Sequence, residues 1–204
     1  MENDLKQLVG QGEKILYEGR PDKKCFIFES IFNPLFPFAL IWALIDFAVI
    51  GTIIFTDAGE DGMKLFIIPF MMLHLMPVWI YLAGIIFTAR KYRNTYYIVT
   101  DRSLYISGGL FSKTYKQKPF AELSHVDLHR GIFDQMFNVG DIITTSSQRS
   151  NENGLASMKI SSISNYIEVY NLVKKLQQDI YTDVMYPNDM RPSENHGYNT
   201  QYKG

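Results

Sequence analysis

Two long apolar runs dominate the pattern of the first half of the chain. The first extends from Phe36 to Phe55 and the second from Leu65 to Phe87, and each holds one acidic or basic side chain, Asp46 and His74 respectively. Because a helix of about 20 residues crosses a hydrocarbon core of roughly 30 Å, each run predicts a membrane-spanning helix. The short polar stretch 56–64 between the runs predicts a tight turn, so that the two helices form a hairpin.

Basic residues lie on the outer sides of this hairpin, which occupies residues 36–87. They are Arg20, Lys23 and Lys24 before the first run, and Arg90, Lys91 and Arg93 after the second. The turn itself contains a single basic residue, Lys64. Because short segments rich in Lys and Arg stay on the cytoplasmic side of a membrane, the pattern predicts a multi-pass protein of the plasma (inner) membrane with both the N- and C-termini in the cytoplasm. Residues 1–35 then form a cytoplasmic N-terminal segment, which is too charged for a secretory signal peptide.

Asp46 and His74 occupy matching positions in the two runs. Asp46 lies nine residues before the end of the first run, and His74 lies nine residues after the start of the second. An antiparallel hairpin therefore brings both to the same depth, where a lone charge costs several kcal/mol. We expect a hydrogen bond between them, which either fixes the register of helices within or between subunits or serves as a proton or ion relay. Pro69 and Pro77 are expected to bend the second helix.

The pattern changes at Thr95, where short aromatic and β-branched runs separated by turn residues replace the long apolar runs. Closely spaced short strands predict a small antiparallel barrel or sandwich, and Asn153-Gly154 predicts a hairpin turn. From Asn165 onward, apolar residues at helical spacing predict a helix that closes the strand domain. The predicted fold class is therefore α+β, with a transmembrane hairpin, a strand domain over residues 92–181 and a disordered tail over 182–204.

The order of these elements resembles the bacterial pleckstrin-homology-like (PH-like) family of membrane proteins, formerly called domain of unknown function 304. The resemblance covers about residues 12–176 and rests on GEKILYEGRP before the runs and on YIVTDRSLYISGG after them. Its most specific mark is the turn Thr100-Asp101-Arg102, although Ser103 replaces a second basic residue that the family usually has. The resemblance implies a cytoplasmic barrel closed by a C-terminal helix and held at the membrane by the spans. It implies no agreed catalytic activity and leaves the ligand of the barrel open.

Composition and motifs add little further chemistry. The formal net charge of −1 argues against a nucleic-acid partner, and the single cysteine, Cys25, excludes an internal disulfide. Because the sequence contains no nucleophile elbow or phosphate-binding glycine loop, we expect neither an enzyme nor a cofactor. His125, Asp127 and His129 point to one side of a predicted strand, but alternate strand residues are about 7 Å apart, which suits a single ion poorly. A solvated strand face explains them equally well, and we expect no metal site.

Two further groups of residues are candidates for binding. The basic group consists of Arg102, Lys113, Lys116 and Lys118. It either faces the anionic inner leaflet or forms a solvated edge that discourages aggregation. The apolar group consists of Ile132, Phe133 and Phe137, in a turn that also contains Met136. It either plugs the barrel or contacts lipid or a partner.

The sequence favours a membrane-anchored cytoplasmic PH-like module for binding or scaffolding. Such a module would recognise a protein partner in the membrane or associate with its own copies as a homo-oligomer. One alternative is a sensor of anionic lipid headgroups. Another is a small transporter or channel subunit built round Asp46 and His74, which would have to oligomerise because two spans enclose no pore.

Overall fold

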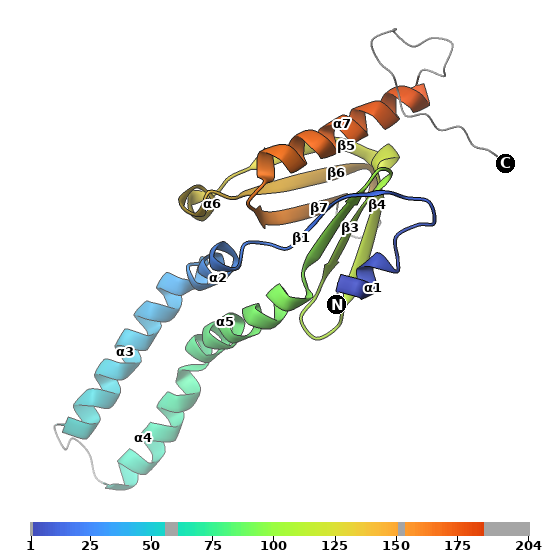
Figure 1. Ribbon diagram of the computed structural model, residues 1–204. Helices are drawn as coiled ribbons and strands as arrows, with labels where there is room; N and C mark the ends of the chain where they lie inside the picture. The colour runs from blue at the N-terminus through green and yellow to red at the C-terminus, as the bar shows by residue number, and fades with distance from the viewer. Residues whose placement is uncertain (1, 56–60, 151–153, 186–204) are drawn as a thin grey trace. The chain divides into compact units, whose positions relative to one another are not determined.

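The chain folds into two units in the computed structural model, which describes residues 2–55, 61–150 and 154–185 (Figure 1). The helical unit consists of Ile27–Arg90. The β-rich unit combines the chain up to Phe26 with the chain from Lys91 onward. The protein is thus a mixture of helices and antiparallel sheet, in agreement with the predicted α+β class.

The first apolar run forms helix α3 (Leu35–Phe55) in the helical unit. Only Ala39 and Asp46 of this 21-residue helix are buried, whereas large side chains such as Leu44 and Phe47 are each 61% exposed. Its mean hydropathy reaches 2.4, so that by length and composition it could cross a membrane. The helix that the sequence predicted is therefore present with nearly the expected bounds.

The second apolar run forms two helices, α4 (Asp61–His74) and α5 (Met76–Asn94), which meet at an angle of 47°. Only as a bent pair do they pass the same test of length and composition. Pro77 explains the break, because it has no N–H to donate and its ring collides with the carbonyl four residues earlier. Pro69 lies inside α4, which continues through it. Of the two prolines expected to bend the second helix, only Pro77 lies at the observed interruption between α4 and α5.

The β-rich unit contains two antiparallel sheets. The first has the strand order β1 (Ile15–Gly19), β2 (Tyr96–Thr100), β3 (Ser103–Gly108) and β4 (Thr114–Pro119). The second has the order β5 (Leu123–His129), β6 (Gly140–Ser150) and β7 (Gly154–Ile163). Within the described residues the strands pair only inside each sheet, so they form two sheets and not one closed barrel.

Strand β1 was not predicted from the sequence. It pairs with β2 through Glu18 opposite Ile98 and Gly19 opposite Tyr97, although α2 (Lys23–Ile31) and the helices α3 to α5 separate the two strands along the chain. Its residues are mostly exposed, so it lacks the alternating apolar pattern of a half-buried strand. The pairing adds the N-terminal segment up to Phe26 to the β-rich unit, whose second segment begins at Lys91.

The C-terminal helix α7 (Tyr166–Met185) covers the second sheet. It contacts β5, β6 and the short 3₁₀ turn η1 (Phe120–Glu122). Val169, Val173 and Leu176 are buried in the main apolar cluster, which also contains residues of both sheets. The periodicity of the sequence therefore identified the packed face of this helix correctly.

The end of the chain extends the predicted helix. α7 continues to Met185, four residues beyond the expected end of the strand domain at Tyr181. The remaining tail residues, 186–204, and Asn153 of the predicted hairpin turn lie outside the described residues. Strands β6 and β7 on either side of that turn do pair in antiparallel fashion.

The turn between β2 and β3 is fixed by the side chain of Thr100. Its Oγ1 accepts a hydrogen bond from the backbone N–H of Ser103 at 2.9 Å and donates one to a carboxylate oxygen of Glu13 at 2.6 Å. The carboxylate of Asp101 accepts a hydrogen bond from the backbone N–H of Lys14 at 3.0 Å. A threonine hydroxyl can mimic a backbone turn in this way. The turn Thr100-Asp101-Arg102, the most specific feature of the family resemblance, is thus hydrogen-bonded to the segment before β1.

Candidate functional site

The helical unit brings Asp46 and His74 together. Nδ1 of His74 lies 3.0 Å and 3.1 Å from the two carboxylate oxygens of Asp46. The Asp46 side chain is only 1% exposed, whereas that of His74 is 41% exposed. The indole of Trp42 stacks on the imidazole with ring centroids 4.9 Å apart, and its N–H donates to the backbone carbonyl of His74 at 2.9 Å. The pair therefore joins α3 and α4 at one fixed level.

The basic residues proposed from the sequence do not form a single cluster. The β3–β4 register places Lys118 near the β2–β3 turn, with Arg102, and Lys113 beyond the opposite end of β4. Lys113 pairs with Asp4 at 3.0 Å, and Lys118 pairs with Glu122 at 3.5 Å. A strand of this length separates its two ends by about 17 Å. One anionic group therefore cannot contact all four basic side chains of the predicted set.

A different basic cluster lies where the chain enters and leaves the strand domain. A recess of about 10 Å³ is lined by Arg20, Arg93, Asn94, Tyr96, Ser107, Lys113 and Tyr115. The guanidinium of Arg20 lies over the ring of Tyr96, 5.4 Å from its centroid. Such a recess holds about one water-sized group. Arg20 and Arg93 favour a negatively charged one, whereas the charge of Lys113 is paired with Asp4.

Asp4 and Lys113 form an exposed ion pair beside this recess. A hydrogen bond from the ammonium of Lys113 lowers the pKa of the Asp4 carboxyl, and the same contact raises the pKa of Lys113. In the sequence, Arg20 and Arg93 indicate only the orientation of the apolar runs. Their shared position on the outer sides of these runs is the available signal for the recess.

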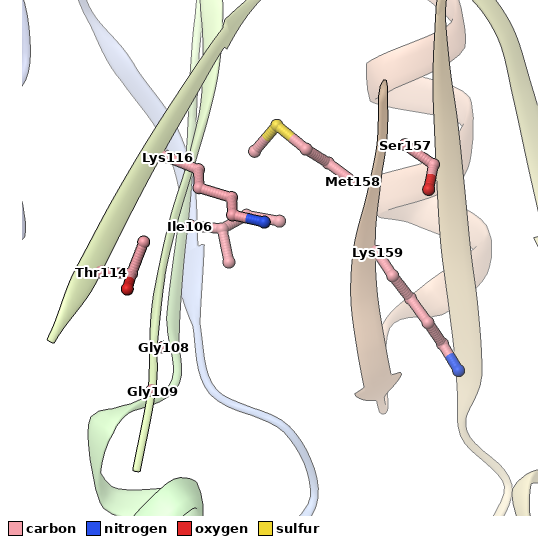
Figure 2. Close-up of a pocket in the computed structure, with 8 residues that line it drawn as sticks. All are labelled: Ile106, Gly108, Gly109, Thr114, Lys116, Ser157, Met158 and Lys159. Atoms are coloured by element: carbon pink, nitrogen blue, oxygen red, sulfur yellow. The ribbon is translucent and has the colours of Figure 1, made fainter. Parts of the chain in front are cut away.

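The two sheets leave a groove between their edges at strands β4 and β7 (Figure 2). Its volume is about 410 Å³, and it is lined by Ile106, Gly108, Gly109, Thr114, Lys116, Ser157, Met158 and Lys159. Figure 2 shows Ile106 and Met158 pointing toward one another from opposite sheets. Pockets of roughly 300–1,000 Å³ with an apolar floor and a few polar groups are typical ligand or peptide sites. Of the predicted basic residues, only Lys116 lines this groove.

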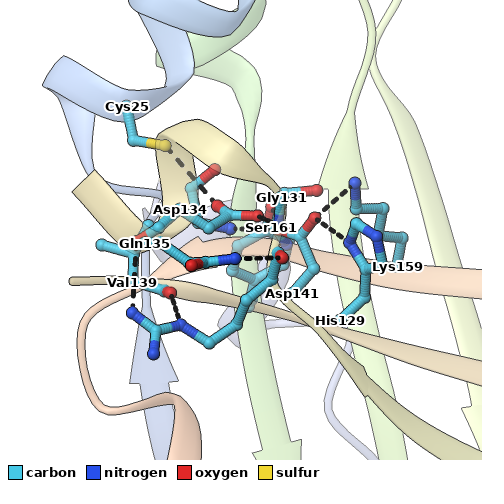
Figure 3. Close-up of polar contacts among 12 residues, drawn as sticks. Cys25, His129, Gly131, Asp134, Gln135, Val139, Asp141, Lys159 and Ser161 are labelled. Carbon is cyan, nitrogen blue, oxygen red and sulfur yellow. Dashed lines mark hydrogen bonds and ion pairs between the residues drawn. The ribbon is translucent and has the colours of Figure 1, made fainter. Parts of the chain in front are cut away.

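A polar cluster of one exposed histidine and two buried carboxylates lies at the end of the predicted histidine strand (Figure 3). His129 approaches Asp134 and Asp141, and the ligand atoms of the three residues lie within 4.8 Å of one another. His125 and Asp127 are exposed on β5 and are not part of this group. Of the three residues singled out in the sequence, only His129 lies in this cluster. The two carboxylates beside it come from α6 (Ile132–Phe137) and β6.

The carboxylates of this cluster already have donors within the protein. Asp141 accepts a hydrogen bond from the backbone N–H of Ser162 at 2.7 Å and pairs with the ammonium of Lys159 at 2.6 Å. Asp134 accepts hydrogen bonds from the backbone N–H of Gly131 at 2.8 Å and from the thiol of Cys25 at 3.5 Å. The ammonium group of Lys159 thus already supplies a positive charge beside Asp141.

Helix α6 presents part of the predicted apolar group to solvent. Ile132 is 82% exposed and Met136 is 59% exposed, whereas Phe133 and Phe137 are half-buried. Side chains four residues apart lie on one face of a helix, so α6 has one exposed and one half-buried apolar pair. The exposure of Ile132 does not fit a plug, and for the two phenylalanines the plug stays a prediction.

Comparison with known families identifies one match. A family model described as a bacterial PH domain matches residues 40–177. The match begins within α3 and ends within α7, so it covers most of the helical unit and strands β2 to β7. No curated protein and no solved structure matches the chain. The family resemblance derived from the sequence is therefore confirmed.

Proposed function

The chain belongs to the bacterial PH domain family, and from this premise we propose that it is a membrane-anchored, non-catalytic binding module. The apolar helices α3, α4 and α5 would hold the protein in the plasma membrane as a hairpin. The β-rich unit would remain in the cytoplasm and bind a protein partner or a second copy of the chain. The helices supply location, and the strand domain supplies recognition.

The exposed apolar surface of α3 carries the membrane part of this proposal. Soluble proteins rarely expose contiguous apolar patches of more than a few hundred Å², yet α3 has 21 residues of which only two are buried. Burying an apolar side chain such as Leu44 or Phe47 is worth about 1.5–3 kcal/mol. A helix with such side chains on nearly its whole circumference is stable when lipid surrounds it.

Fractionation and topology mapping test the anchor. We expect the full-length chain to remain in the membrane fraction after a carbonate wash and to require detergent for release. A reporter fused after Lys175 should be cytoplasmic, and one inserted at the 56–60 connection should face outward. A full-length chain that purifies from the aqueous fraction without detergent would contradict the proposal.

The groove between β4 and β7 is the surface that best fits a protein partner. Its floor is apolar at Ile106 and Met158, and Lys116 supplies a positive charge at its side. Lys116 has no ion-pair or hydrogen-bond partner among the described side chains, so its charge is available to an acidic group. β4 also lies at the edge of its sheet, where backbone groups can pair with an extended segment.

In-membrane crosslinking tests the groove. A photoreactive residue at Lys116 should trap a defined neighbour or a second copy, and the substitution Met158→Asp should abolish that product. A matched probe at Lys174, exposed on α7, should not trap it. Equal crosslinking from both positions would show random proximity and would refute the groove as a recognition site.

The basic recess supports a second candidate function, the binding of an anionic lipid headgroup. Arg20, Arg93 and Lys113 line this water-sized recess, so a headgroup phosphate would lie at its mouth, where each basic residue near an anionic leaflet contributes about 1 kcal/mol. In nanodiscs, the purified chain should enrich anionic over zwitterionic lipid in its surrounding shell. The double substitution Arg20→Gln and Arg93→Gln should remove this enrichment, whereas Lys175→Gln on α7 should not.

The transporter alternative depends on the intramembrane pair. Neutralising Asp46 would then abolish function while membrane insertion stays intact. Because Asp46 is 1% exposed and hydrogen-bonded by His74, its contacts within the unit support a structural role as the simpler reading. Proton or ion flux in proteoliposomes that disappears in Asp46→Asn would favour transport instead.

A further inference from the structure

Helix α6 is held firmly in the β-rich unit. The carboxylate of Asp134, which is fully buried, accepts the backbone N–H of Gly131 at the start of the helix at 2.8 Å. At its end, Asn138 adopts the left-handed conformation with φ of 52°, and the backbone N–H of Val139 donates to the carbonyl of Asp134 at 2.8 Å. Nε of Arg130 donates to the carbonyl of Val139 at 2.8 Å. Both ends of the helix are therefore fixed.

This fixed helix nevertheless exposes two large apolar side chains on one face. Ile132 and Met136 are separated by one helical turn and are 82% and 59% exposed. The two phenylalanines of the same helix are half-buried. Because the helix cannot rotate without breaking the bonds of Asp134, the exposure of this face is a stable feature of the unit.

The chain ties α6 to the beginning of the apolar helices. The thiol of Cys25 donates to the carboxylate of Asp134, and Cys25 precedes the first residue of α3, Leu35, by ten residues. Ten residues span at most about 35 Å when fully extended. Most of them are helical in α2, where the rise is only about 1.5 Å per residue. If α3 crosses a bilayer, the short chain segment 26–34 and the hydrogen bond of Cys25 to Asp134 together keep α6 in the region near its surface.

The residues beside this tether carry positive charge. Lys23 and Lys24 are exposed at the start of α2, directly before Cys25. Exposed apolar side chains next to basic ones are the combination that binds the interface of an anionic membrane. A second protein copy would have to match this mixture with acidic groups, whereas the lipid surface supplies both the apolar layer and the negative charge.

We propose that α6 is a second membrane contact of the β-rich unit, with Ile132 and Met136 inserted into the interfacial layer of the bilayer. This proposal rests on the membrane anchoring proposed above. Its consequence is that the strand domain is held against the lipid surface in one orientation, in addition to being tethered to it by the chain.

Spin-label accessibility in the full-length chain tests the proposal. The protein is placed in nanodiscs that contain phosphatidylglycerol, in a Cys25→Ser background that keeps a hydrogen-bond donor to Asp134. Nitroxide labels are attached at Ile132→Cys or Met136→Cys. Lys174→Cys on α7 serves as the water-exposed control and Leu44→Cys on α3 as the control for the anchor. We expect the labels at Ile132 and Met136 to be more accessible to oxygen dissolved in the lipid than to a water-soluble nickel complex. The label at Lys174 should show the reverse order of accessibility.

The controls separate the two proposals. If Leu44 is exposed to lipid but Ile132 and Met136 are as accessible to nickel as Lys174, the contact of α6 is refuted and the anchor stands. If Leu44 is also accessible to nickel, the anchor itself fails. Spin–spin broadening between labels at Ile132 would show that a second copy covers the face and would also overturn the proposal. As a second variant, Ile132→Asp should make a label at Met136→Cys more accessible to the nickel complex and less accessible to oxygen in the lipid.

Discussion

His74, the last residue of α4, holds the buried carboxylate of Asp46 on α3 through a single ring nitrogen at 3.0 Å. Two helices whose surfaces are otherwise apolar have few ways to define how far one slides along the other. Apolar packing tolerates small shifts, but a hydrogen bond between two polar side chains has one optimal register. The stacked indole of Trp42 completes this contact.

Removal of this pair should destabilise the helical unit by a measurable coupling energy. We expect a double-mutant cycle of Asp46→Ala and His74→Ala to give about 0.6–2 kcal/mol, the usual value of polar bonds between helices in lipid. Unfolding of the full chain in detergent measures it. Leu44→Ala, which truncates an outward-facing side chain, is the control and should change the stability by less than about 0.5 kcal/mol. A coupling energy of zero would exclude a register contact.

Replacing Pro77 should straighten the second apolar segment. In Pro77→Ala the backbone gains an N–H that can bond to the carbonyl four residues earlier, and the clash of the proline ring disappears. Spin labels at Ile68 and Leu82, both exposed, should move apart as the 47° bend decreases. Pro69→Ala is the matched control, because α4 already continues through Pro69. An unchanged label distance in Pro77→Ala would place the cause of the bend elsewhere.

The two adjacent glycines after β3 should respond differently to alanine. Gly109 has a φ of +117°, and a Cβ at this position would collide with the backbone carbonyl of Ser112, whereas a Cβ at Gly108 meets no atom within 4 Å. We expect Gly109→Ala to lower the free energy of unfolding by about 1–3 kcal/mol and Gly108→Ala to change it by less than about 0.5 kcal/mol. Urea unfolding of the full chain in detergent distinguishes them. Similar values for both variants would contradict the strained turn.

Alkaline pH should destabilise the β-rich unit through Tyr97. Burial raises the pKa of this side chain from 10.0 to about 12, and its hydroxyl oxygen accepts the backbone N–H of Ser161 at 3.0 Å. Between these two values the unfolded chain has released the phenolic proton while the folded chain retains it. Stability is therefore fully present below pH 10 and falls as the pH rises toward 12, by about 2–3 kcal/mol at most.

The Tyr97→Phe variant checks this effect. It should be less stable at neutral pH by about 1 kcal/mol, because the N–H of Ser161 loses its acceptor. Its stability should decline less steeply between pH 10 and 12 than that of the parent chain. Tyr115→Phe, at an exposed position, controls for the loss of a hydroxyl. Parallel declines for the parent and Tyr97→Phe would show that another group governs the alkaline transition.

Local patterns in the sequence were sufficient for several elements. The bounds of α3 followed from an uninterrupted apolar run, and the buried face of α7 followed from apolar residues at helical spacing. The shared level of Asp46 and His74 followed from counting residues in two antiparallel helices. In each case the information lies in residue type and in the spacing of residues along regular helices, which fixes the geometry.

Other features depended on pairings between distant parts of the chain. β1 joins the first sheet although the whole helical unit separates it from β2. The basic recess gathers Arg20, Arg93 and Lys113 from three separate segments. The polar cluster of His129, Asp134 and Asp141 likewise joins a strand, a helix and a neighbouring strand. The residues in each of these contacts lie on separate segments of the chain, so no regular spacing in the sequence indicates that they meet.

The sequence by itself determined which segments are apolar helices, which region is β-rich and which family the chain belongs to, because these properties are set by residue type and short-range spacing. Only the tertiary structure decided which charges meet and which apolar side chains remain outside. Ile132 and Phe133 are neighbours with similar hydrophobicity, yet one is 82% exposed and the other half-buried. The bonds of Asp134 orient the helix that carries both, and such contacts arise only after the chain has folded.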